Sequence, residues 1–98
     1  MNNNKLIEPP DYIDGAKLIK WAWSGQEPFY RIYSEDRTEF EEIYGLAICQ
    51  YEKSNSVYHF SCDQEWETIQ DAPYNNVDKA VHSLPNQYRN KETIWHDK

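Results

Sequence analysis

Hydrophobic and polar side chains alternate along much of the chain, a pattern with a period of two that is typical of half-buried β-strands. In the first such stretch, Ile19, Trp21 and Trp23 occupy one set of alternate positions and Leu18 and Ala22 the other. The pattern predicts strands over residues 16–24, 28–34, 43–52, 56–62 and 66–70. Residues 24–27 are short enough for a hairpin between the first two strands.

A helical period replaces this alternation in the last third of the chain. One apolar stripe has the spacing i, i+3, i+4, i+7, and its members are Val77, Ala80, Val81 and Leu84. This stripe predicts a single helix, with Asn75 or Asn76 as its N-cap and Pro85 as the residue that ends or kinks it. Residues 92–96 could add an edge strand.

These elements predict an α+β fold, an antiparallel sheet of five or six strands with one helix packed on one face. Chain length favours a single domain, which we assign to residues 15–98. Residues 1–14 form a loose N-terminal leader, since Pro9-Pro10 suits neither a helix nor a central strand. The charged residues 34–42 form a loop or one helical turn.

The register between residues 43–52 and 56–62 decides which side chains share a face. Pairing Ile48 with Phe60 places Cys49 and His59 on one face and Cys62 on the other. We therefore expect no Cys49–Cys62 disulfide. This register would bring Cys49 and His59 close enough to form a nucleophile pair. No third residue that would orient them is evident, so we interpret Cys49 as a small buried hydrophobe.

Apolar and aromatic side chains occur on both faces of the predicted strands, and one short helix covers only one face. We expect a homodimer that buries the helix-free face, because large exposed apolar patches are uncommon on monomers. The alternative is that the leader, through Leu6, Ile7, Tyr12 and Ile13, folds across that face and keeps the chain monomeric.

Charge is distributed unevenly along the chain. The formal net charge is −7, and residues 35–71 contain ten acidic side chains against two basic ones, a balance of −8. Such a segment repels nucleic acid and attracts a basic protein, although a solubilising surface is the simpler interpretation. The candidate partner-binding residues are Glu39, Glu41, Glu42, Asp63, Glu65, Glu67, Asp71 and Trp66.

Other candidate chemistry is weak. Asp63, Glu65 and Glu67 alternate like calcium ligands but lack the central glycine of a calcium loop. His59, His82 and His96 have no zinc spacing, and the three glycines form no phosphate-binding loop. We therefore assign no catalytic residue, no cofactor and no metal.

The two cysteines form no Cys-x-x-Cys motif, and the chain contains no apolar run long enough for a signal peptide or a membrane span. These features predict a cytoplasmic protein with reduced thiols that does not bind membranes.

The aromatic content is high, at 15% of residues. The rings of Trp21, Trp23, Tyr30, Tyr33, Tyr44 and Tyr51 could stack on a ligand, but core and interface roles are commoner.

Residues 58–71 match a pattern with Tyr58, Phe60, Cys62, Asp63, Trp66 and Asp71 at its fixed positions. Together with the Ala80-bearing helix and the Thr93-Ile94-Trp95 ending, this resembles a group of short, uncharacterised bacterial proteins. The chain departs from that group at Pro85, where the group's helix would continue. Small acidic proteins of this kind are similar to immunity proteins and to products of mobile gene cassettes such as integrons, and the resemblance implies no catalytic residues.

Two functional hypotheses follow from the sequence. The first is a non-enzymatic binding protein, of the immunity type, that inhibits a basic protein through residues 35–71. The alternative is a small-molecule-binding or enzymatic domain that uses an aromatic pocket.

Overall fold

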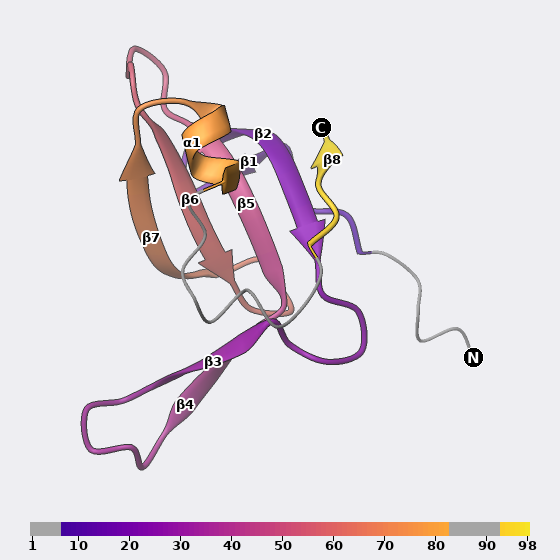
Figure 1. Cartoon of the computed structure of the whole chain (residues 1–98), viewed down its shortest axis with the longest axis vertical. Coiled ribbons are helices and arrows are strands. Elements are labelled where there is room, and N and C mark those ends of the chain that lie inside the picture. Colours follow the sequence, from indigo (N-terminus) through magenta and orange to yellow (C-terminus); the bar gives the residue numbers. More distant parts are fainter. Residues whose placement is uncertain (1–6, 83–92) are drawn as a thin grey trace.

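An antiparallel sheet dominates the structure, a computed structural model that describes residues 7–82 and 93–98 (Figure 1). The strand order is β1-β2-β5-β6-β7, and β8 pairs with β2 beside β1. The sheet is formed by β1 (Tyr12–Ile13), β2 (Ala16–Trp23), β5 (Gly45–Gln50), β6 (Val57–Cys62), β7 (Thr68–Tyr74) and β8 (His96–Asp97). A separate two-stranded hairpin is formed by β3 (Tyr30–Tyr33) and β4 (Phe40–Ile43), and the described helix is α1 (Val77–His82).

The chain is thus mostly antiparallel sheet with one short helix, which confirms the broad α+β prediction. All five predicted strands are found within a few residues of their expected positions, as β2, β3, β5, β6 and β7. These strands contain the β-branched and aromatic alternation that suits a pleated surface with burial on both sides.

The predicted hairpin between the first two strands is wrong. β2 pairs with β5, while β3 pairs with β4. Gly25, at φ +91°, turns the chain out of the sheet after β2, and the backbone N–H of Ser24 donates to the carbonyl oxygen of Tyr44 (2.9 Å). The second half of the charged segment 34–42 is strand β4 rather than a helical turn, and the β3–β4 hairpin projects from the body of the sheet (Figure 1).

The predicted register of β5 and β6 is also wrong. Ile48 lies opposite His59, and Ala47 lies opposite Phe60, one residue away from the expected pairing. The connecting turn sets this register: Ser54 N–H donates to Tyr51 O (3.1 Å), and Lys53 adopts a left-handed conformation at φ +71°. A shift of one residue exchanges the faces of a whole strand, and the hydrophobic pattern could not detect it because both faces are apolar.

The shift has two consequences for the cysteines. Cys49 and Cys62 lie in the same core cluster, so the argument that they occupy opposite faces is wrong, and both are free, buried thiols. His59 lies on the other face with Ile48, so it does not pair with Cys49.

A bulge in β2 changes the facing of its side chains as well. The pairing with β5 jumps between Leu18 and Lys20, so that Leu18 and Trp21, three positions apart, both join the cluster around Cys49. Ile19 packs in the cluster of the opposite face. A bulge inserts one unpaired residue into a strand, which is why strict alternation failed here.

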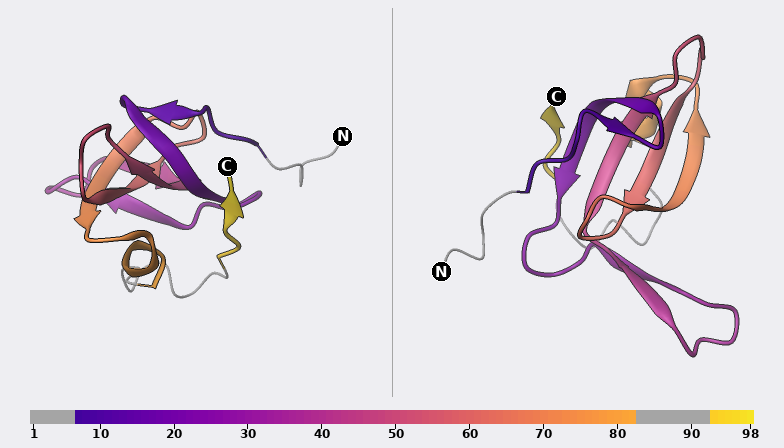
Figure 2. Two further views of the ribbon diagram at one scale, coloured as in Figure 1. Left: turned by 90° about the horizontal axis from the view of Figure 1, so that it is seen from above. Right: turned by 180° about the vertical axis from the view of Figure 1, so that it is seen from behind.

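The sheet is curled, and both of its faces carry packed clusters (Figure 2). On one face, which we call the helix face, Ala80 of α1 packs with Ile48 and Val57. The opposite face is filled by the cluster Ile13, Ala16, Leu18, Trp21, Ala47, Cys49, Phe60, Cys62 and Trp66. The expectation of an uncovered helix-free face therefore fails for the described residues.

The end of the leader contributes to this second cluster. Ile13 is buried in it, and Tyr12 and Ile13 pair with Lys17 and Ala16 of β2. The loose leader therefore does not extend to residue 14. The sequence left open the alternative that the leader covers the helix-free face in place of a second chain, and the contact by Ile13 agrees with it. Leu6 lies outside the described residues. Self-association stays a prediction.

Helix α1 begins as predicted, because the side-chain oxygen of Asn76 accepts the backbone N–H of Lys79 (2.9 Å) and so caps the helix. Leu84 and Pro85 lie outside the described residues. A C-terminal edge strand is present as β8, beside Lys20 and Trp21 of β2, but it overlaps the predicted range 92–96 only at His96.

Candidate functional site

Four of the acidic residues proposed from the sequence line a single cavity of about 310 Å³. This cavity, which we call the acidic cleft, lies between the β3–β4 hairpin and the turn that follows β6. Its lining residues are Phe40, Glu41, Glu42, Tyr44, Asp63, Gln64 and Glu65. The fold thus brings together two acidic segments that are far apart in the sequence.

The hairpin wall of the cleft follows from the alternation of a strand. Phe40, Glu42 and Tyr44 are two residues apart, so their side chains point to the same side of the chain. Arg31 and Tyr33 lie opposite Glu42 and Phe40 and share their face. The other face of the hairpin, with Tyr30, Ile32 and Ile43, packs against the body of the sheet. Glu41 lies opposite Ile32 and so belongs to this other face, although it also lines the cleft.

Hydrogen bonds to the sheet hold the base of the hairpin in place. The Tyr30 hydroxyl donates to Gln70 Oε1 (3.1 Å), and its oxygen lies 3.2 Å from Ser61 Oγ. The backbone N–H of Phe29 donates to Ile43 O (2.7 Å). The hairpin wall is therefore fixed relative to strands β6 and β7.

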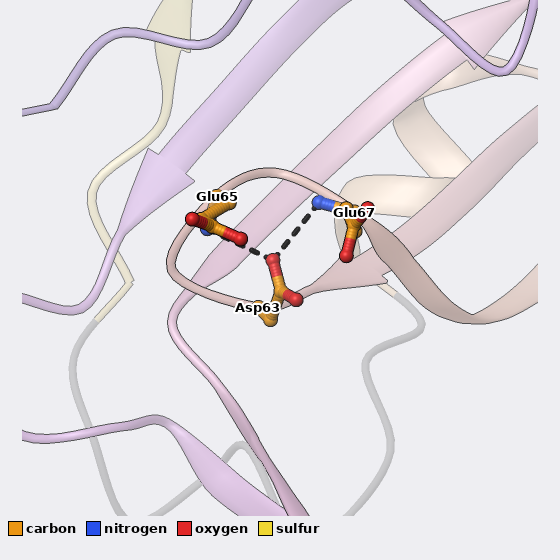
Figure 3. A group of neighbouring side chains, drawn as sticks. All are labelled: Asp63, Glu65 and Glu67. Atoms are coloured by element: carbon orange, nitrogen blue, oxygen red, sulfur yellow. Dashed lines mark hydrogen bonds between the residues drawn. The ribbon is translucent and has the colours of Figure 1, made fainter.

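The opposite wall is a turn organised by Asp63 (Figure 3). One carboxylate oxygen, Oδ1, accepts the backbone N–H groups of Glu65 (2.8 Å) and Glu67 (3.0 Å). The backbone N–H of Asp63 in turn donates to Glu67 O (3.0 Å). These bonds close the turn, and its residues Asp63 and Glu65 line the cleft.

Trp66 anchors this turn in the core. It adopts a left-handed backbone conformation (φ +62°), is only 6% exposed, and lies edge-on to Trp21 at 6.2 Å between ring centroids. Its ring lies where a Cβ atom on Gly45 would be, with the closest ring carbon 2.5 Å away. The sequence proposed Trp66 as a partner-contact residue. Its side chain is instead buried and positions the acidic turn from inside.

Two arginines of the hairpin neutralise part of its charge. The guanidinium of Arg31 lies 4.5 Å from the centre of the Phe40 ring, and its Nη2 lies 3.2 Å from Glu42 Oε2. Arg37, at the tip, lies 5.0 Å from the centre of the Tyr33 ring. Of these two, Arg31 contacts two residues of the cleft, Phe40 and Glu42.

The remaining candidates are more dispersed. Glu39 lines a neighbouring cavity at the hairpin with Tyr33 and Phe40. Glu67 lies near Asp63 but lines a different cavity, next to β1, and the exposed Asp71 lies opposite Phe60 in the sheet and does not line the cleft. The acidic residues thus form one focused site and several separate positions.

Tyr44 was among the rings that the sequence offered for stacking, but sequence reasoning missed Phe40 and the neighbouring Arg31 as parts of a site. The signal was present, because Phe40, Glu42 and Tyr44 alternate as in a strand. It was overlooked because the high charge of residues 34–42 favoured a loop.

Asp63, Glu65 and Glu67 can bring one carboxylate oxygen each to within 4.8 Å of one another, a separation at which three acids could hold a cation (Figure 3). However, Oδ1 of Asp63 already accepts two backbone hydrogen bonds, and Glu65 and Glu67 are exposed. These features explain the cluster as a turn, so we assign no metal to it.

Burial makes the candidate nucleophiles unreactive. It raises the pKa of the Cys49 and Cys62 thiols to about 12, so both are protonated at neutral pH. Burial also lowers the pKa of His59 to about 4, which keeps its ring neutral. With Cys49 and His59 on opposite faces, the Cys–His nucleophile hypothesis is excluded.

Comparison of this chain with protein families, with curated proteins and with solved structures found no match. Among the described residues, no helix has the length and apolarity needed to cross a membrane.

Proposed function

We propose that this protein is a non-enzymatic, cytoplasmic binding protein whose acidic cleft accepts a basic segment of a partner protein. It would act as an immunity-type inhibitor of that partner. The observation that carries the proposal is the convergence of Glu41, Glu42, Asp63 and Glu65 around one cavity with Phe40 and Tyr44. Clustered carboxylates attract a basic partner over long range, and aromatic walls add short-range contact.

The aromatic residues at the cleft are of a kind that protein interfaces favour. Two aromatic rings near its opening are substantially exposed, Tyr33 at 43% and Phe40 at 48%. Exposed aromatic side chains surrounded by charges are typical of binding surfaces, where they supply contact area at low conformational cost. The hairpin also projects from the sheet, so a partner can reach its open side (Figure 2).

Two double variants that change the net charge equally can test whether the carboxylates of the cleft bind the partner. Glu41→Gln/Glu65→Gln removes two charges from the cleft. Glu52→Gln/Asp71→Asn removes two from exposed positions outside the cleft, in the same acidic segment. Their matched net charge means that any difference in affinity reports the location of the binding site.

The measurement is capture of basic proteins from the genome of origin, followed by titration calorimetry of the captured partner at low and high salt. We expect the cleft variant to weaken binding by about tenfold, or about 1.4 kcal/mol, and the distant variant by much less. Equal effects of the two variants, or binding that does not respond to salt, would contradict the proposal.

A second candidate function is favoured by a different cavity. The exposed rings of Tyr12 and Tyr51 line a cavity of about 510 Å³ at the far end of β5, together with Lys17 and Ile19. A small-molecule-binding or enzymatic domain would use this cavity with the two tyrosines as its aromatic walls. Fluorescence across a metabolite panel, with Tyr51→Leu as the control, tests it: a ligand-dependent change that Tyr51→Leu abolishes would favour this function over the first.

A further inference from the structure

The acidic cleft already has a guanidinium group at its edge. Arg31 stacks on Phe40 and forms an ion pair with Glu42, and both of these residues line the cleft. The chain itself thus shows which cation this combination of an aromatic ring and a carboxylate holds.

The internal contact is weak enough to be replaced. The side chains of Arg31 and Glu42 are 47% and 34% exposed, and an ion pair with that exposure contributes little to stability. Stacking of a cation on an exposed ring adds a similarly small amount. An incoming cation that met Glu41, Asp63 and Glu65 as well would have more acidic neighbours than Arg31 has.

We propose that an arginine side chain of the basic partner is the anchor of the interaction, and that Arg31 is its intramolecular competitor. This inference rests on the proposed function and names the group that the cleft recognises. Binding displaces Arg31 from Phe40 and Glu42, and the partner's guanidinium then contacts these two residues from within the cleft.

Arginine fits the cleft better than lysine for two reasons. A guanidinium is flat and stacks on the face of an exposed ring such as Phe40, whereas an ammonium is compact and strongly hydrated. A guanidinium also presents several N–H donors in one plane, so it can bond carboxylates from both walls at once. The cleft provides carboxylates on both sides, from Glu42 on the hairpin and Glu65 on the turn.

Arg37 offers a matched control. It belongs to the same hairpin and stacks on an exposed ring, but that ring, Tyr33, does not line the cleft, whereas Phe40 and Glu42, the contacts of Arg31, do. Arg31→Gln and Arg37→Gln remove the same charge, so electrostatic attraction for a basic probe rises in both variants. Only Arg31→Gln also frees Phe40 and Glu42.

The probes are a short oligoarginine peptide and an oligolysine peptide of equal length, titrated by calorimetry against the full chain and both variants. Circular dichroism checks that each variant is folded. We expect oligoarginine to bind the full chain more tightly than oligolysine. Arg31→Gln should raise the affinity for oligoarginine roughly threefold to fivefold more than Arg37→Gln does.

The outcomes separate this inference from the proposed function. Equal gains from the two variants, or equal binding of the two peptides, would overturn the arginine anchor while leaving salt-dependent binding of a basic partner intact. Failure of both peptides and of every basic protein to bind would overturn both proposals.

Discussion

The closest approach in the fold, between Gly45 and the ring of Trp66, gives the sharpest test of how the acidic turn is held. A Cβ atom on Gly45 would lie 2.5–2.8 Å from three ring carbons of Trp66, well inside normal contact distance. Gly45 has no positive φ, so its backbone accepts alanine. The consequence of Gly45→Ala therefore depends on the ring alone.

The ring has little room to move. Trp66 is buried between Trp21 and Trp23, whose ring centroids lie 6.2 and 5.6 Å away. Overpacking of this kind costs about 1–3 kcal/mol, and alanine in a strand recovers about 0.5–1 kcal/mol relative to glycine. We expect a net loss of about 1–2 kcal/mol, which for a chain of this size lowers Tm by about 5–10 °C.

The assay is chemical and thermal unfolding of a double-mutant cycle. Trp66→Leu costs stability by itself but removes the ring, so Gly45→Ala in that background should cost nothing or stabilise slightly. If Gly45→Ala is neutral in the native background, or costs the same in both backgrounds, the proposed contact between Gly45 and Trp66 is refuted.

Three further predictions concern buried groups and assembly. The pKa of His59 is about 4 in the folded chain and about 6.5 unfolded, so lowering the pH from 6.5 to 4 should remove about 3 kcal/mol of stability. His59→Gln should remove this part of the pH dependence, as measured by denaturant unfolding at the two pH values. Cys49 and Cys62 should resist thiol reagents at pH 8 in the native state and react in denaturant, as followed by mass spectrometry; native labelling at the denatured rate would contradict their burial. Light scattering tests the homodimer predicted from the sequence: twice the chain mass of 11.8 kDa would support it, whereas a monomer would mean that Ile13 and its neighbours suffice to close the helix-free face.

The sequence predicted those features that depend on local patterns. Strands β2, β5, β6 and β7 follow from alternation, and the Asn76 cap follows from its position before the apolar stripe of α1. These features require only neighbouring residues, so a single sequence suffices.

Features that depend on backbone conformation escaped prediction. The left-handed Lys53 sets the register of β5 and β6, and the bulge between Leu18 and Lys20 redirects Ile19. Neither leaves a hydrophobic signal when both faces of the sheet are apolar. The acidic residues of the cleft were predicted as a group, but the aromatic walls needed the knowledge that residues 40–44 are extended.

The central claim is that the acidic cleft binds a basic segment, and chemical-shift mapping tests it most directly. Backbone amide spectra of the full chain would be recorded during titration with the oligoarginine peptide. The account predicts the largest shifts at residues 40–44 and 63–65, the two walls of the cleft. Shifts centred on Tyr12 and Tyr51, or spread evenly over the acidic residues, would contradict it.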